Sequence, residues 1–431
     1  MSTALQHDTA YERKTLVLLG LGFGLVGLDR WIVAPLFPHM MHDLGLNFQQ
    51  LGSLIGILSV TWGVWAIAMG AVSDRIGRKK ILVVTMIAFS LLSSLSGLAT
   101  SFASLMLIRA VMGIAEGAFT PASVAATGEA SLPSRRGFNQ GLQLSMFSLL
   151  GLGFAPILAT QLLRVVPSWH WVFMISAAPG LIVAALIART LRDQPRSVGV
   201  GVRTTARSTA RGTATSSAAR PRWTALFASR NVWLAMAAIL CAMAGIFVVS
   251  AMVPTYLVEV LHLDTQSMGF VVSAIGFGGF IGSFGVAGVS DYIGRRNAAV
   301  IAFVAAAALL YVFSCTGPNP QLLFALLFGI SVFALGLLGL LSGPIATEAA
   351  PLGLVASSVG FVSGTGEIFG GGLAPVIAGF IAQHFGLAFT LDFALGGLIA
   401  GAAVSLFLVE TAPRKLAERA VVPGTSGDQP V

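Results

Sequence analysis

The chain has few charged residues. Only 10% of its 431 residues are Asp, Glu, Lys or Arg, against roughly 25% in an ordinary soluble domain. Hydrophobic residues make up 56% of the sequence, and the mean hydropathy is +0.87. A soluble fold could not bury that much apolar surface. The composition therefore excludes a soluble globular protein and indicates one that is embedded in lipid.

Cysteine and histidine are scarce. The two cysteines, Cys241 and Cys315, both fall within apolar stretches, which argues against a disulfide framework or a thiolate metal cluster. His39 and His42 are spaced to share a helix face, but no third ligand lies near them in the sequence, so we expect no metal site. No Ser-His-Asp or phosphate-handling constellation lies near a membrane face. We therefore expect neither an enzyme nor a bound cofactor.

A sizeable soluble domain is also missing, which argues against a membrane sensor or an assembly factor. The net charge of +8 does not indicate nucleic-acid binding, because the basic residues lie in short loops between apolar stretches. Each stretch has about twenty residues, enough to cross a ~30 Å hydrocarbon core as a helix. The first is too long for a signal-peptide core, so we expect it to be retained. We predict twelve membrane spans, near residues 16–38, 51–72, 80–99, 103–127, 138–163, 170–190, 231–257, 267–289, 297–316, 320–347, 354–384 and 387–409.

Basic residues mark one side of the membrane. Apart from the loop with Arg164, the loops that carry arginine and lysine fall on the same side, which the positive-inside rule identifies as cytoplasmic, with both termini inside. An arginine-rich segment among Ser, Thr, Ala and Gly follows the sixth span and is typical of a flexible linker. The predicted organisation is an N-terminal six-helix half at 1–190, a basic cytoplasmic linker at 191–230, a C-terminal six-helix half at 231–410 and a cytoplasmic tail at 411–431.

One motif occurs twice. GAVSDRIGRKK, from Gly70 to Lys80, recurs as GVSDYIGRR, from Gly288 to Arg296, each time between the second and third spans of a half. Duplication of a six-helix unit explains the repeat. Each copy puts a carboxylate near a helix end, facing guanidinium groups across a turn that glycine permits. We expect a conformational latch that breaks and reforms as the halves rock, formed by Gly70, Asp74, Arg75, Gly77, Arg78, Asp291, Gly294 and Arg295.

A few charges lie inside the spans: Asp29 and Arg30 in the first, Arg109 and Glu116 in the fourth, and Glu367 in the eleventh. Each costs roughly 2.5 to 3.5 kcal/mol at the centre of a membrane helix, so such residues usually face a wet cavity and have a function. Arg109 and Glu116 are two helical turns apart on one face. The alternative for the arginines is an internal ion pair that holds helices in register, and for Glu367 it is a carboxylate that only packs helices together.

The sequence around these charges resembles a known family. The first span reads GLDRWIVAPLFPHM followed by DLGLNFQQLGSL, and the fourth reads RAVMGIAEGAFTPAS. Together they are similar to the anion:cation symporter branch of the major facilitator superfamily. The resemblance implies an all-α integral membrane fold, with twelve transmembrane helices in two six-helix pseudo-symmetric halves and a substrate site between them. It also implies proton-coupled uptake of a small organic anion, such as an aromatic carboxylate or a sugar acid, by alternating access in a bacterial inner membrane.

The same resemblance implies roles for the buried charges. Asp29 and Glu116 match the family's carboxylates linked to proton coupling, so the proton gradient is the expected energy source. Arg30 and Arg109 match its arginines associated with the carboxylate of the substrate. A guanidinium suits this role because its planar fork grips a carboxylate with two parallel hydrogen bonds.

Three further residues are candidates for substrate contact. Phe147 stands in the fifth span where sugar-acid members would have a polar glutamine, which disfavours a polyhydroxylated substrate. Tyr256 and Glu367 are the others, and Glu367 lies in the glycine-rich stretch GTGEIFGGG, which lets backbone and ligand come close. For most of the aromatic residues in the spans, packing or lipid contact is the simpler interpretation.

A proton-driven multidrug or metabolite efflux antiporter of the same fold is the alternative function. A strong glycine-proline pattern in the fifth span would favour it, and here Gly151, Gly153 and Pro156 form only a weak version. The expected partners are the organic anion, protons and membrane lipid, without nucleic acid. We expect the protein to act as a monomer.

Overall fold

The structure is a computed structural model of the chain, and it describes residues 8–132, 135–192, 226, 229–350, 355–412 and 415. Within these ranges, the side chains of residues 67, 70–76, 136, 137 and 355–357 lie outside the description. The described residues form helices and their connections, without a strand. The basic linker expected at 191–230 and the tail expected at 411–431 fall mostly outside the described residues.

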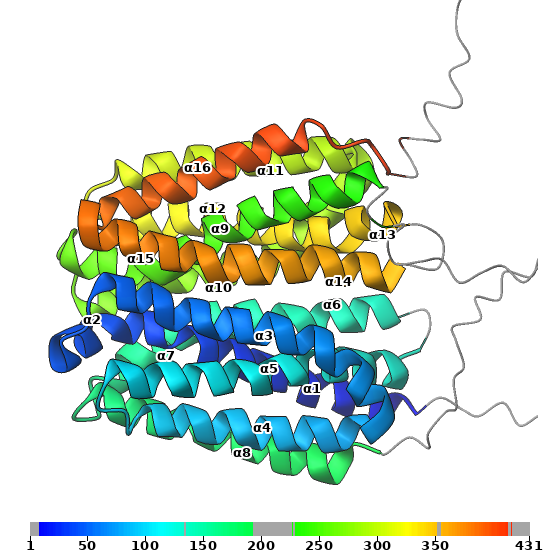
Figure 1. The fold of residues 1–431 in the computed structure, drawn as a ribbon, viewed down its shortest axis with the longest axis horizontal. Coiled ribbons are helices and arrows are strands. Elements are labelled where there is room, and N and C mark those ends of the chain that lie inside the picture. Colours follow the sequence, from blue (N-terminus) through cyan, green and yellow to red (C-terminus); the bar gives the residue numbers. More distant parts are fainter. Residues whose placement is uncertain are drawn as a thin grey trace, which may run out of the picture.

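Two helical bundles pack against each other, with the N-terminal one in the lower part of Figure 1 and the C-terminal one in the upper part. The N-terminal half contains α1 (Thr9–Trp31), α2 (Val33–Leu44), α3 (Phe48–Ile76), α4 (Arg78–Ser96), α5 (Phe102–Ala130), α6 (Arg136–Met146), the π-helix η1 (Phe147–Phe154), α7 (Ala155–Leu162) and α8 (Trp169–Thr190). The C-terminal half contains α9 (Arg230–Glu259), α10 (Thr265–Ile293), α11 (Arg295–Ser314), α12 (Pro320–Leu340), η3 (Leu341–Ile345), α13 (Ala346–Glu348), α14 (Val355–Thr365), η4 (Gly366–Leu373), α15 (Ala374–Phe385) and α16 (Ala388–Ser405).

The predicted membrane fold is confirmed. Among the described residues, 11 helical stretches are long and apolar enough to cross a membrane. The remaining span of the prediction corresponds to α3, a helix of 29 residues. Several spans consist of consecutive helical elements, such as α6, η1 and α7, because the helix changes its winding without leaving the membrane.

Local sequence explains where several helices begin. Ser101 and Ser104 form a capping box at the start of α5, and the Asp264 side chain accepts the Gln266 and Ser267 backbone N–H groups at the start of α10. The hydrogen bonds from Ser267 hold the pKa of Asp264 below its ordinary value, so the cap stays charged at neutral pH. α11 begins after Gly294, whose φ of 99° is strained for other residues.

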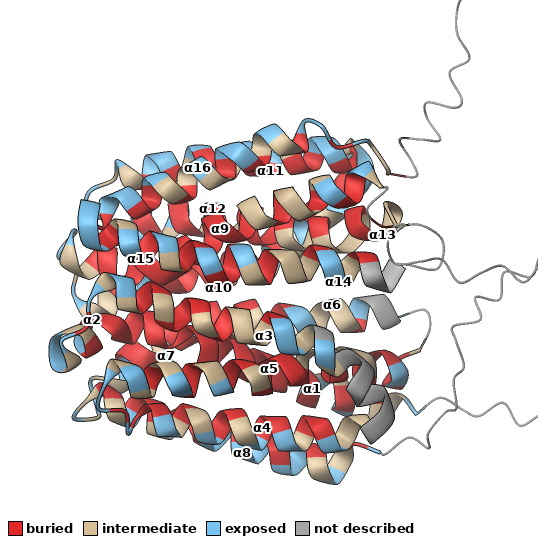
Figure 2. Cartoon of the chain, viewed as in Figure 1, coloured by how far each residue is buried: buried red, intermediate tan, exposed pale blue. Residues whose placement is uncertain are grey.

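The outer faces of both bundles are apolar. On α4, Val84, Ile87, Leu91 and Leu95 are exposed at helical spacing, while the opposite face is buried. Figure 2 shows exposed residues on the outer surface of the bundles and buried residues where helices meet. An exposed apolar stripe of this length is suited to lipid, in agreement with the composition.

Several polar contacts join the two halves at one end of the molecule. We name the end where α1 begins and α16 ends the linker end, on the right in Figure 1, and the opposite end, where α2 ends and α3 begins, the far end. At the far end, several polar contacts cross from one half to the other: Gln161 to Gln266, Gln266 to the Thr160 carbonyl, Phe48 to Gln383, His39 to Thr265, and His42 to Glu259. The halves are therefore closed against each other at the far end.

Glycine allows this close approach. A methyl group added to Gly276 of α10 would overlap the backbone of Gly153 in η1, and one added to Gly27 of α1 would overlap the backbone of η1 on its other side. Helices without side chains at the contact can bring their backbones together. η1 is therefore packed tightly between its own half and the opposite half.

Candidate functional site

Asp29 and Arg30 lie at the end of α1, where the chain turns at Ile32 before continuing as α2. Both side chains are buried, with 2% of each residue exposed. Being consecutive on a helix, they point to different neighbours. Asp29 accepts a hydrogen bond from Ser93 of α4 at 2.8 Å, and Ser93 also contacts Ser176 of α8 at 2.9 Å. Asp29 thus faces the interior of the N-terminal half.

Arg30 faces the interface between the halves. Its Nη2 donates to Ser59 Oγ of α3 at 2.8 Å and to Glu367 Oε2 of η4 at 2.9 Å. The Arg30–Glu367 ion pair therefore joins the two halves at the level of the turn after α1. The structure brings together these two predicted residues, which are 337 positions apart in the sequence.

Four aromatic rings surround the Arg30 guanidinium, and we name them the aromatic cage. The guanidinium carbon lies 5.1 Å from the ring centre of Phe247, 5.7 Å from Trp62, and 5.8 Å from both Trp31 and Phe147. Distances below about 6 Å allow cation–π attraction, which adds roughly 2 kcal/mol or more when water is excluded. Phe147, a predicted candidate for substrate contact, is therefore one of the rings beside the Arg30 guanidinium.

Arg109 of α5 has a different position. Its Nη1 donates to the backbone carbonyls of Asp29 at 3.0 Å and Arg30 at 3.1 Å. These carbonyls lie in the last turn of α1, where a helix leaves acceptors without intrahelical partners. Arg109 is 2% exposed and lies outside the aromatic cage. In this conformation it holds the helix end that presents Arg30.

Glu116, two turns further along α5, is fully buried at 0% exposure. Within the described part of the chain, neither of its carboxylate oxygens has a hydrogen-bond partner. Asp29, Arg30 and Arg109 lie near enough for their charges to interact with the Glu116 carboxylate. Glu116 is therefore a buried acid beside two guanidinium groups, without a donor of its own.

Tyr256 does not join this group. It is buried within the C-terminal half, with its ring centre 6.5 Å from that of Phe313. The residues that sequence reasoning missed are Ser59, Ser93, Ser176 and Phe247. Serine and phenylalanine are ordinary in membrane helices, so only their tertiary position distinguishes them.

The predicted latch is partly described. The Asp291 carboxylate pairs with Arg295 at 2.6 Å, and Arg295 also pairs with Glu348 at 2.9 Å. In the other half Arg78 pairs with Glu129 at 2.6 Å, and Gly77 has φ 102° like its counterpart Gly294 at 99°. Gly70, Asp74 and Arg75 lie in α3, and their side chains are outside the described residues.

Glu129 and Glu348 are equivalent partners that the sequence prediction did not include. They stand 51 and 53 residues after Arg78 and Arg295. This nearly equal spacing in the two halves is a signal that could have found them. These ion pairs at the linker end each stay within one half.

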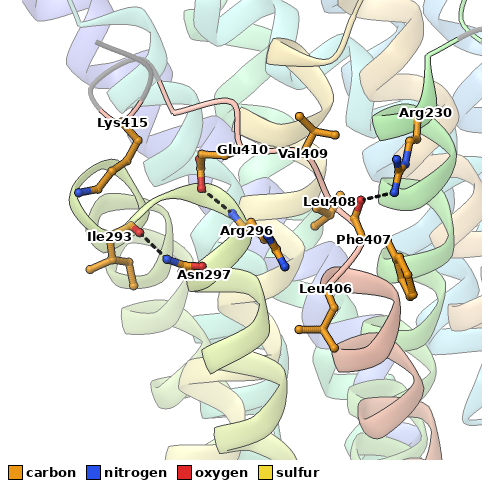
Figure 3. A pocket seen from close by; sticks show the side chains of 10 residues that line it. All are labelled: Arg230, Ile293, Arg296, Asn297, Leu406, Phe407, Leu408, Val409, Glu410 and Lys415. Atoms are coloured by element: carbon orange, nitrogen blue, oxygen red, sulfur yellow. Dashed lines mark hydrogen bonds between the residues drawn. The ribbon is translucent and has the colours of Figure 1, made fainter. Parts of the chain in front are cut away.

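A separate cavity of about 490 Å³ opens at the linker end of the C-terminal half. Figure 3 shows Arg230 donating to the Phe407 carbonyl, at 3.1 Å, and Glu410 beside Arg296. Its lining comes from α9, the end of α10, α11 and the segment after α16, namely Arg230, Ile293, Arg296, Asn297, Leu406, Phe407, Leu408, Val409, Glu410 and Lys415. It lies within one half, away from Arg30.

Comparison with known proteins identifies the family. The family model described as "Major Facilitator Superfamily" matches residues 19–368. The chain belongs to the major facilitator superfamily. It is therefore a membrane transporter and not an enzyme.

Similar proteins of this superfamily are named as organic acid transporters. The chain is 28% identical over 383 residues to the "Probable 4-methylmuconolactone transporter" of Cupriavidus pinatubonensis (strain JMP 134), covering 88% of this chain and 85% of the relative. It is 27% identical to the "Probable L-galactonate transporter" of Escherichia coli (strain K12), covering 94% and 91%. These names agree with the resemblance to the anion:cation symporter branch.

A solved structure supports the fold. The crystal structure of a bacterial homologue of the human lysosomal transporter Spinster, in an inward-facing and occupied conformation, matches with a TM-score of 0.70 at 20% identity. The match covers 96% of this chain and 98% of that chain. The major facilitator fold predicted from the sequence is thus confirmed over nearly the whole length.

Proposed function

We propose that this transporter carries a small organic anion inward together with protons, by alternating access of its two halves. The observation that supports the proposal most strongly is the position of Arg30, a buried guanidinium at the interface of the halves that already binds a carboxylate. We place the protein in a bacterial inner membrane with both termini in the cytoplasm, because the basic loops lie on the side of the termini.

Arg30 is suited to hold the anion. It projects from the N-terminal half toward the C-terminal half, so a ligand on it touches both. Substrate sites of transporters with repeated halves lie at this interface. An arginine also favours anions over cations, which makes the relatives' organic acids a suitable guide to the substrate class.

Glu116 and Asp29 are suited to carry the protons. Glu116 has no hydrogen-bond partner among the described residues, so it gains and loses a proton without breaking a contact. Arg30 and Arg109 lie near enough to Glu116 for their charges to interact with its carboxylate. Binding of an organic anion to Arg30 then links the proton on Glu116 to the presence of substrate.

The closed far end represents one stage of the cycle. With the cytoplasm at the linker end, the conformation described above is closed toward the outside. Uptake requires the far-end contacts to open and the linker-end latch of each half to rearrange. The Arg30–Glu367 pair lies between the two ends. In the proposed cycle, this position is accessible from one side of the membrane in each conformation.

Transport in liposomes tests the proposal. Purified protein is reconstituted with a trapped pH dye, and aromatic carboxylates, sugar acids and short dicarboxylates are added one at a time. We expect one class to acidify the lumen. In Glu116→Gln this acidification falls about tenfold or more, because the amide cannot bind a proton, while exchange of labelled anion across the membrane continues.

Asp8→Asn is the matched control, since Asp8 is an exposed carboxylate paired with Arg192 far from the site. It should acidify the lumen like the wild type. Full gradient-driven uptake by Glu116→Gln would show that Glu116 does not carry the coupled proton. No response to any anion, combined with export of lipophilic cations, would establish the efflux antiporter instead.

A further inference from the structure

The guanidinium of Arg30 is occupied by a carboxylate from its own protein. Glu367 Oε2 accepts from Nη2 at 2.9 Å, and Glu367 is 9% exposed. The contact described uses one guanidinium nitrogen, while the buried Nε has no hydrogen-bond partner. A guanidinium can bind a carboxylate through two parallel hydrogen bonds. Glu367 therefore leaves part of the binding capacity of Arg30 unused.

Other buried donors beside Arg30 are also unpaired. Among the described residues, the indole N–H groups of Trp31 and Trp62 are buried without an acceptor. Buried polar groups are nearly always paired, so each exception needs an explanation. Three unpaired donors around one guanidinium are explained by a ligand that brings acceptors, such as the carboxylate of a substrate.

The segment around Glu367 is rich in glycine. It lies in η4, a π-helix that contains Gly366, Gly370, Gly371 and Gly372. A methyl group added to Gly371 would lie 3.1 Å from Glu367 Oε2 and 2.8 Å from the Phe247 ring. A side chain at position 371 would therefore clash with the Phe247 ring, and glycine lets η4 carry Glu367 this close to the aromatic cage.

The aromatic cage limits the shape of the ligand. Trp31, Trp62 and Phe147 come from the N-terminal half and Phe247 from the C-terminal half, and the Trp31 and Phe247 rings meet edge to face at 5.2 Å. Flat rings stack well among aromatic side chains. A polyhydroxylated chain needs many hydrogen-bond partners, and the side chains of the cage offer only the two indole N–H groups.

We propose that Glu367 is an internal counter-anion that holds the substrate's place on Arg30, and that a flat monocarboxylate displaces it. This inference rests on the proposed function, in which Arg30 binds the transported anion. The carboxylate of the substrate takes two guanidinium donors in place of one, and its ring lies among the aromatic cage. Glu367 then gives up its hydrogen bond to Arg30.

Direct binding tests the proposal. Purified protein in lipid nanodiscs is titrated with benzoate, a flat monocarboxylate, by isothermal calorimetry. We expect Glu367→Gln to bind benzoate about tenfold more tightly or better than the wild type, because the competing carboxylate no longer occupies Arg30 in most molecules. Asp8→Asn removes an arginine-paired carboxylate elsewhere and should bind benzoate like the wild type. Arg30→Gln should not bind it.

Two further probes test the substrate class. Cyclohexanecarboxylate has the same charge and a similar size without a flat ring, and gluconate has hydroxyl groups. Both should bind at least about tenfold more weakly than benzoate. Glu367→Asp, which keeps the charge but shortens the side chain, should fall between the wild type and Glu367→Gln, and it serves as the test if the amide variant does not fold.

The outcomes separate the two proposals. Equal or weaker benzoate binding by Glu367→Gln, with binding by the wild type, would overturn the counter-anion while leaving anion transport in place. Equal binding of gluconate or cyclohexanecarboxylate would overturn the flat substrate class. Absence of carboxylate binding and transport in both proteins would overturn the proposed function as well.

Discussion

At the scale of single residues, Arg30 and Arg109 differ in the groups that they contact. The Arg30 guanidinium lies at the interface of the halves. Arg109 Nη1 donates hydrogen bonds to two backbone carbonyls of α1. Only Arg30 lies within the aromatic cage. The two predicted substrate-binding arginines therefore make different contacts in this conformation.

Arg109→Met should lower the stability of the protein. The methionine has a similar length but no donor, so two buried carbonyls lose their partner, at about 1 to 3 kcal/mol for each group left unpaired. The measurement is the unfolding temperature in detergent. Arg192→Met removes an exposed ion pair and should leave this temperature nearly unchanged.

If Arg109→Met unfolded at the same temperature as Arg192→Met and yet lost anion binding, Arg109 would be a substrate contact and not a support for α1. Benzoate titration of the same samples makes that distinction.

At the scale of elements, two π-helices stand in equivalent places of the two halves. η1 and η4 each have 8 residues and lie in the fifth and eleventh spans. Such wider turns are frequent at functional sites. η1 begins with Phe147 and η4 carries Glu367, so each places one side chain against Arg30. The irregular winding of these spans is thus part of how the site is built.

The contact of η1 with α10 should control closure of the far end. Gly276→Val would push α10 away from the backbone of Gly153. We expect Thr160→Cys, at a buried far-end position with 1% exposure, to react several-fold faster with a membrane-impermeant maleimide when Gly276→Val is present. The measurement requires a background in which Cys241 and Cys315 are replaced by serine.

Gly285→Val provides the control on the same helix, because nothing lies within 4 Å of a methyl group added there. Its reaction rate should match that of the background protein. If Gly276→Val and Gly285→Val accelerated the maleimide reaction equally, the composition of α10, and not its contact with Gly153, would govern the closure.

At the scale of the whole molecule, the two halves are joined at the far end and at the Arg30–Glu367 pair between the ends. The far-end contacts are mostly neutral hydrogen bonds between exposed or half-buried side chains, such as Gln161 to Gln266 at 2.7 Å. Contacts of this kind contribute about 0.5 to 1.5 kcal/mol each. If the protein works by alternating access as proposed, contacts of this strength can hold the far end closed and still open during the cycle.

Fixing the far end should stop uptake. Gln161→Cys with Gln266→Cys, in the background without other cysteines, is linked by a bis-methanethiosulfonate reagent that a reductant cleaves. We expect transport in liposomes to fall to the level of empty liposomes after linking and to recover with dithiothreitol. Each single cysteine variant treated in the same way should transport normally, and uptake by the linked protein would contradict alternating access.

The sequence by itself determined the membrane environment, the twelve spans and the repeat of the two halves, because these depend on local composition and spacing. It also marked the buried charges, since a charge in an apolar helix stands out in the sequence. It could not decide which partner each charge has. That depends on the packing of helices that are distant in the chain.

Only the tertiary structure joined Arg30 to Glu367, turned Arg109 toward the backbone of α1 and left Glu116 without a hydrogen-bond partner among the described residues. It also placed Tyr256 beside Phe313 and Phe247 beside Arg30. The physical reason is that a helix fixes which residues share a face, whereas its rotation and depth against other helices are set by the contacts of the assembled bundle.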